Sequence, residues 1–87
     1  MTLMKLLFTT LSFFMLLSST KAIDAGDQLK MVVAKQKLYA GQFIGALTIY
    51  KEVLQKNPDD GLVLYYVGKC QYQLKKYDEA TETLKKL

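Results

Sequence analysis

The stretch GALTIYKEVLQKNPDDG, residues 45–61, decides the fold of this 87-residue chain. Its apolar residues recur at spacings of three and four, which is the period of one face of an α-helix. Pro58, the single proline of the chain, follows this pattern, and a proline ring cannot be accommodated by the preceding helical turn. Asp59 or Asp60 is a suitable N-cap for a further helix. The stretch therefore predicts a helix, its end and the start of the next helix.

The sequence on both sides of this stretch has the same helical period. Apolar residues at this spacing predict helices over 27–40, 43–56 and 61–74, and a fourth helix within 75–87. No segment alternates apolar and polar residues as a half-buried strand would. A chain of 87 residues is at most one small domain. We therefore expect an all-α fold of antiparallel helix-turn-helix pairs.

When the sequence is moved along itself so that Ala34 falls on Gly68, the first helix pair is superposed on the second. We call this displacement the repeat shift. Small residues fall on small residues where two helices would cross closely, since Ala46 also falls on Ala80. Identities are few, and agreement in residue size carries the comparison. Large apolar residues also fall on large apolar residues: Val33 on Val67, Phe43 on Tyr77, Tyr50 on Leu84, and Val53 on Leu87. The alternative is an ordinary bundle of two helical hairpins with small residues at its crossings.

With this period, the chain resembles the tetratricopeptide repeat family, whose unit is a helix-turn-helix of about 34 residues. The resemblance covers about residues 27–87, with a first repeat at about 27–60 and an incomplete second repeat at about 61–87. It implies a short right-handed solenoid of stacked helix pairs. The first copy departs from the family pattern at Lys30 and Lys37, where large aromatic residues are usual. The matching residues are Ala34, Leu38, Phe43, Ala46, Tyr50 and Pro58 in the first copy, and Gly68, Tyr72, Tyr77 and Ala80 in the second.

Residues 1–22 have the layout of a secretory signal peptide. Lys5 is followed by an apolar run, Leu6 to Leu17, and then by small and polar residues that end at Ala22. The alternative is an uncleaved membrane anchor, but a spanning helix needs about 20 apolar residues and this run is shorter. We therefore expect cleavage after Ala22 and no stable membrane span thereafter. The expected location is the periplasm or the exterior of a bacterial cell.

Charge and residue types exclude several classes of function. The chain carries a formal net charge of +4, and removal of Lys5 and Lys21 with the signal peptide leaves ten lysines against eight acidic residues. It contains no arginine for bidentate contacts to phosphate or guanine, so we expect no nucleic-acid partner. It also contains no histidine and a single cysteine, Cys70, which excludes a Cys/His zinc site. We expect no bound metal or cofactor.

Catalytic chemistry is not expected either. Cys70 has no histidine as a base partner. Its neighbours at helical spacing favour a buried packing position. The alternative is that this lone thiol pairs with another chain in an oxidising compartment. The carboxylate pairs Asp59-Asp60 and Asp78-Glu79 lie at predicted helix starts, where acidic side chains complement the helix dipole. We therefore predict that the chain is not an enzyme.

Binding remains, and the resemblance implies where it occurs. In the repeat family the first helix of each pair lines a concave groove. The carboxylates of an extended peptide in that groove would contact the lysines, and its apolar groups would contact the tyrosines. The alternative is that the tyrosines pack between helices and that the lysines form a solvated edge. The groove residues that follow by position are Met31, Lys35, Leu38, Tyr65, Lys69 and Tyr72.

Two hypotheses of function follow. The first is an exported interaction module of a bacterial cell envelope that binds a partner protein or peptide. The second is a set of N-terminal docking repeats of a longer exported enzyme. The second copy stops at Leu87, and its predicted apolar face of Ala80, Leu84 and Leu87 has no successor. This face predicts either a continuation of the chain or self-association through the uncapped C-terminal helix.

Overall fold

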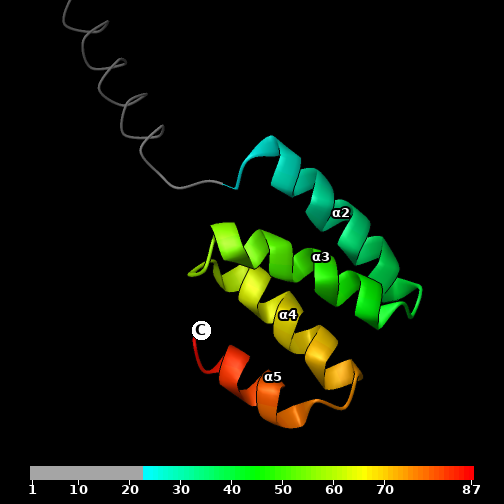
Figure 1. Cartoon of the computed structure of the whole chain (residues 1–87), viewed down its shortest axis with the longest axis vertical. Coiled ribbons are helices and arrows are strands. Elements are labelled where there is room, and N and C mark those ends of the chain that lie inside the picture. Colours follow the sequence, from blue (N-terminus) through cyan, green and yellow to red (C-terminus); the bar gives the residue numbers. More distant parts are fainter. Residues whose placement is uncertain (1–22) are drawn as a thin grey trace, which may run out of the picture.

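The computed structural model describes residues 23–87, and the predicted signal peptide with its cleavage position lies outside the described residues. Figure 1 shows the helices following one another as antiparallel neighbours, with α2 against α3, α3 against α4, and α4 against α5. Residues 23–87 contain no β-strand, which confirms the predicted all-α class of packed helix pairs. The helices are α2 (Ala25–Tyr39), α3 (Phe43–Lys56), α4 (Gly61–Gln73) and α5 (Tyr77–Leu84).

Aspartates at two loop ends explain where α2 and α4 begin. The Asp60 carboxylate accepts hydrogen bonds from the backbone N–H groups of Leu62 and Val63, at 3.0 and 3.1 Å, so the N-cap expected at residue 59 or 60 is Asp60. Asp24 accepts from the backbone N–H of Asp27 at 2.7 Å in the same way. Because this cap lies ahead of the apolar pattern, α2 begins two residues earlier than its periodicity predicts.

The two turns inside the helix pairs have the same backbone conformation. Gly41 and Lys75, which the repeat shift superposes, both have a positive φ, of 80° and 63°. After each of them a backbone N–H reaches back five residues, from Gln42 to Lys37 and from Lys76 to Gln71, at 2.8 and 2.9 Å. This is the Schellman pattern that ends a helix through a left-handed residue. Lys75 adopts this conformation despite its side chain, at a cost of about 1 kcal/mol.

Tyr50 of α3 lies at the centre of the core. Its side chain is fully buried, and its ring stacks on that of Tyr66 from α4 with centroids 5.0 Å apart and an interplanar angle of 3°. Its hydroxyl has no hydrogen-bond partner among the described residues, and burial raises its pKa. The stack joins the first helix pair to the second. The buried core cluster consists of Ala34, Leu38, Ala46, Leu47, Tyr50, Val53, Val63, Val67 and Cys70.

Small residues allow the close helix crossings that the repeat shift predicts. Ala34 and Ala46 are fully buried, and Ala80 is 3% exposed. Gly68 of α4 faces Leu84 of α5, and a Cβ atom at Gly68 would lie only 2.6 Å from Leu84 Cδ2. A larger residue at position 68 would therefore displace α5 or the Leu84 side chain.

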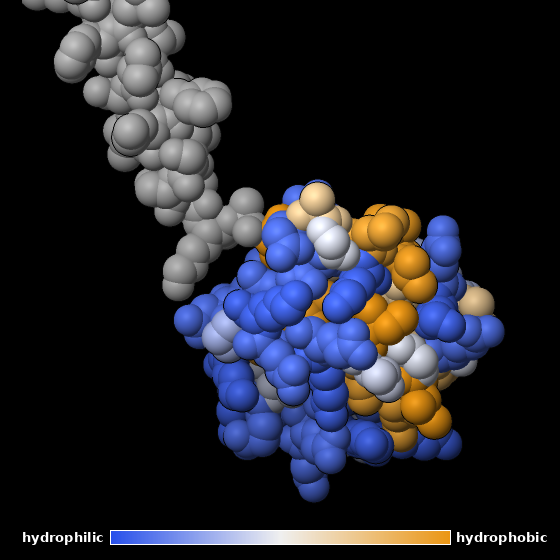
Figure 2. Space-filling model, turned by 45° about the horizontal axis from the view of Figure 1, so that its top comes forward, coloured by the Kyte–Doolittle hydropathy of each residue, from blue (hydrophilic) through white to orange (hydrophobic). Residues whose placement is uncertain are grey.

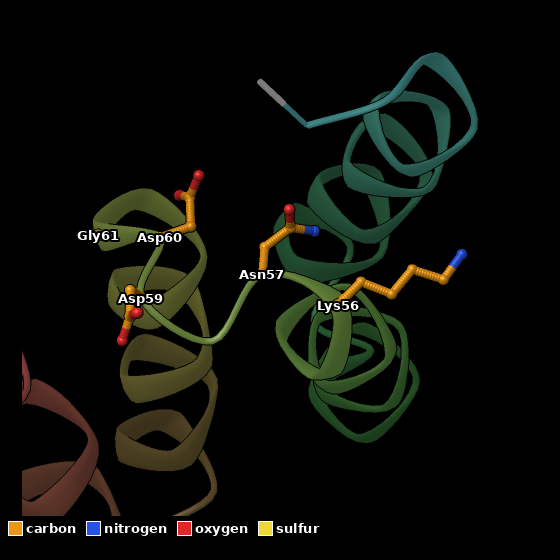
Figure 3. A pocket seen from close by; sticks show the side chains of 5 residues that line it. All are labelled: Lys56, Asn57, Asp59, Asp60 and Gly61. Atoms are coloured by element: carbon orange, nitrogen blue, oxygen red, sulfur yellow. The ribbon is translucent and has the colours of Figure 1, made fainter. Parts of the chain in front are cut away.

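A buried carboxylate, which the sequence analysis did not single out, fixes the start of α2 to the end of α3. Asp27 is 2% exposed, and its oxygens lie 3.5 Å from the donor nitrogen of Asn57 and 3.7 Å from Lys56 Nζ. Figure 3 shows Lys56 and Asn57 extending on the α2 side of the turn. A buried charge needs such partners.

Among residues 23–87, no helix combines the length and the apolar character needed to cross a membrane.

The contact between Gly68 and Leu84 leads to a test by double mutation. Replacing Gly68 with Ala gains about 1 kcal/mol of helix propensity but overpacks Leu84, so we expect a net loss of about 1 kcal/mol in the free energy of unfolding. In a Leu84→Ala background the clash is gone, and the same change is expected to stabilise by about 1 kcal/mol. Urea unfolding of the four chains measures both values. The same sign in both backgrounds would contradict the close packing of α4 against α5.

Candidate functional site

The exposed side chains of the two first helices form the candidate site, which we call the first-helix face. It consists of Lys35 and Tyr39 on α2 and of Tyr65, Lys69 and Tyr72 on α4. Four of these side chains are exposed and Lys69 is half-buried. The opposite sides of both helices are held in the core by buried apolar residues, so packing orients this face toward solvent.

On α2, a lysine lies over a tyrosine one turn further along the helix. Lys35 Nζ is 6.0 Å from the centroid of the Tyr39 ring, at the outer limit of a cation–π contact. Tyr39 was not among the residues predicted for the groove, although its i, i+4 spacing from Lys35 is the signal that would have identified it.

Two other residues predicted for the groove on α2 lie elsewhere. Leu38 is 5% exposed and belongs to the core cluster, so its assignment to the groove is corrected: the turn after α2 and the packing against α3 draw it inward. Met31 is half-buried and packs against the same cluster.

On α4, the three predicted residues take part in three contacts with aromatic rings. Lys69 Nζ lies 5.9 Å from the centroid of the Tyr65 ring, and Tyr65 meets Tyr66 edge to face at 5.4 Å. Tyr72 meets Tyr77 of α5 in the same geometry at 5.3 Å. These contacts hold amphipathic rings at the surface, since Tyr65 and Tyr72 remain 46% and 59% exposed.

The structure does not join the α2 residues directly to those of α4. Between residues 23 and 87, no hydrogen bond, ion pair or ring contact connects the Lys35–Tyr39 pair with the Lys69–Tyr65 pair. The lysines occupy equivalent positions of the two repeats, but the ring follows the lysine on α2 and precedes it on α4. An extended ligand would therefore meet two separate Lys–Tyr pairs.

The charges of the described residues are distributed unevenly between first and second helices. Helix α4 contains no acidic residue, and the one acidic residue within α2, Asp27, is buried beside Lys56. The other carboxylates lie on α3 and α5 or in the loops before α2 and α4. The first-helix face thus carries exposed positive charge with no carboxylate of its own helices to neutralise it.

In the polar pocket at the turn between α3 and α4, the charged groups of Lys56 and Asp60 already have partners. The pocket has a volume of about 350 Å³ and is lined by the five residues labelled in Figure 3. The Asp60 carboxylate caps α4, while Lys56 lies beside Asp27. Within residues 23–87, no cluster of three or more histidine, cysteine or acidic side chains has the spacing to hold a metal ion.

Cys70 is a packing residue rather than an exposed nucleophile. It is fully buried in the core cluster, and burial raises the pKa of its thiol to about 11. The reactive thiolate is therefore scarce at neutral pH. The predicted inward-facing position is confirmed.

Comparison with known proteins gives one match. A family model described as tetratricopeptide repeat matches residues 37–87, which is more than half of the chain and includes α3, α4 and α5. Searches of curated proteins and of solved structures found no match.

The raised pKa of Cys70 predicts a loss of stability in alkali. Between about pH 9 and pH 11 the folded chain keeps the thiol proton while the unfolded chain releases it, so the free energy of unfolding falls as the pH rises. A Cys70→Ala chain has no thiol to titrate. Over this pH range we expect its free energy of unfolding to fall by up to about 2 kcal/mol less than that of the unmodified chain. Urea unfolding from pH 7 to pH 11 measures the difference. Parallel pH profiles of the two chains would contradict the burial of the thiol.

Proposed function

The chain belongs to the tetratricopeptide repeat family, and from this we propose that it is an exported binding module that holds an acidic segment of a partner protein on its first-helix face. Repeats of this family generally mediate protein–protein interactions and are typically non-catalytic. The proposal adds the surface, the chemistry of the partner and the cellular location, and it assigns the chain no enzymatic activity.

The observation that carries the proposal is that each repeat places a lysine of its first helix over a tyrosine ring of the same helix. The repeat shift superposes Lys35 on Lys69, and their ammonium groups lie 6.0 and 5.9 Å from the centroid of a tyrosine ring. Core packing does not require either lysine, because both lie outside the buried cluster. A ligand that lies across both helices would contact both lysines.

A partner segment with acidic and apolar residues fits this surface. Its carboxylates would pair with the two ammonium groups, and its apolar side chains would lie on the tyrosine rings. The absence of acidic residues from α4 removes the repulsion that such a segment would otherwise meet. An extended conformation would let it contact both lysines in turn.

Export is proposed on the sequence of residues 1–22 alone. Their charged start, apolar run and small residues before Ala22 are the features of a cleaved secretory signal. The resulting location would be the periplasm or the exterior of a bacterial cell.

Binding is tested with a charge-reversal variant of the full chain. Short peptides in which acidic residues alternate with apolar ones are screened against the chain on an array, and the dissociation constant of the best peptide is measured by fluorescence anisotropy. We expect Lys35→Glu with Lys69→Glu to weaken binding about tenfold, or about 1.4 kcal/mol. We also expect added salt to weaken the binding of the unmodified chain.

The matched control is Lys51→Glu with Lys85→Glu. These lysines are exposed and are also superposed by the repeat shift, but they lie on α3 and immediately after α5. Because two lysines become glutamates in both double variants, the change in net charge is the same. The control should bind almost as well as the unmodified chain. Equal losses in the two double variants would show non-specific charge attraction and would overturn the proposed surface.

Export is tested by fractionating bacterial cells that produce the full chain. We expect the chain in the periplasm or the medium, with Ile23 as its first residue by N-terminal sequencing. Placing two lysines in the apolar run, by Leu11→Lys and Phe14→Lys, should keep it in the cytoplasm with residues 1–22 attached. An unmodified chain that stays in the cytoplasm, or in the membrane with residues 1–22 intact, contradicts the proposal.

A further inference from the structure

Two apolar surfaces at opposite ends of the helix array are not used by the proposed function. On α2, Leu29, Val32 and Val33 are 66%, 53% and 39% exposed. On and after α5, Leu84 and Leu87 are 38% and 62% exposed. Figure 2 turns the α2 side toward the viewer and shows an apolar band across an otherwise hydrophilic surface. Apolar surface of this kind favours burial, by about 25 cal/mol for each Å² removed from water.

The exposed residues of α5 are the repeat equivalents of buried residues on α3. Tyr50 and Val53 of α3 are fully buried, and Tyr50 contacts α4 through its stack on Tyr66. The repeat shift places Leu84 at the position of Tyr50 and Leu87 at the position of Val53. The end of the array formed by α5 therefore presents the same side that α3 uses to receive α4.

The exposed residues of α2 are, in the same way, the equivalents of residues by which α4 packs on α3. Val63 and Val67 of α4 are 0% and 1% exposed and belong to the cluster shared with α3. In α2 the corresponding side has no covering helix among the described residues. The α2 residues at the positions of Val63, Tyr66 and Val67 are, in order, Leu29, Val32 and Val33.

We propose that a second copy of this chain covers each of these surfaces, with α5 of one copy packing on α2 of the next. The interface would repeat between chains the α3–α4 contact that exists within each chain. Leu84 of one copy would meet Val32 of its neighbour, as Tyr50 meets Tyr66. The exposed apolar residues of the two surfaces occupy the positions that meet in the α3–α4 contact, so each surface offers the other a matching partner.

This association is head-to-tail, because the two surfaces differ. Each copy that joins leaves one α5 surface and one α2 surface free at the ends, so the product is an open series of copies rather than a closed pair. The association would extend the helix array from one chain to the next. Each chain would then stabilise its neighbour as adjacent repeats do within one chain. None of the five exposed residues belongs to the first-helix face, so this proposal and the proposed function can fail separately.

Cysteine cross-linking in cells that produce the full 87-residue chain tests the geometry. A short bis-maleimide is added to chains that carry Val32→Cys, Leu84→Cys or both, and the products are detected with an antibody to the chain. We expect the double variant to give a ladder of dimers, trimers and longer products. The single variants alone should resemble the unmodified chain, whose Cys70 is buried, and the two single variants produced together should give dimers only.

A matched pair of substitutions tests the role of the apolar surface. In the double-cysteine chain, Leu29→Lys should abolish the ladder, whereas Ile44→Lys should leave it unchanged because Ile44, also exposed, lies on α3, which belongs to neither surface. A ladder that survives Leu29→Lys would overturn the proposal. So would dimers from either single variant, which indicate a symmetric contact, or cross-links to a host protein in place of a second copy.

Discussion

The stack of Tyr50 on Tyr66 is the contact on which the arrangement of the two helix pairs depends. Tyr50 is fully buried on α3 and its ring lies parallel to that of Tyr66, 5.0 Å away, on α4. Because α3 also packs against α2, this one helix connects both pairs. The Tyr50 hydroxyl, which has no partner within residues 23–87, is a cost of placing a tyrosine at this position. The large flat ring offsets that cost by filling the space between the pairs.

The small residues and the two left-handed turns make the second pair repeat the geometry of the first. Ala34 and Gly68 let the second helix of each pair approach closely, and a Cβ atom at Gly68 would clash with Leu84. Gly41 and Lys75 give both turns the same path through the left-handed region. The repeat period therefore exists in the backbone as well as in the sequence, although few side chains are identical.

Packing divides each first helix into a buried side and a free side, and this division links the fold to binding. The buried sides of α2 and α4 carry small and branched apolar residues. The free sides carry Lys35 and Lys69 beside tyrosine rings, while exposed acidic residues lie on second helices and loops. The same division leaves apolar residues exposed at the two ends of the array, because the first and last helices each have a side without a neighbour among the described residues.

The sequence by itself determined the all-α class, the four helices, the repeat period and the close crossings at small residues. These features depend on local spacing, on Pro58 and on the Asp60 cap, all of which act within a few residues. Tertiary structure alone decided that Leu38 is buried rather than exposed to a ligand, and that Asp27 is buried beside Asn57, which is distant in sequence. The helical period shows which residues share a face of a helix. Which of these residues meet a neighbouring helix depends on the angle at which the two helices pack, and that angle is set by contacts between residues far apart in the chain.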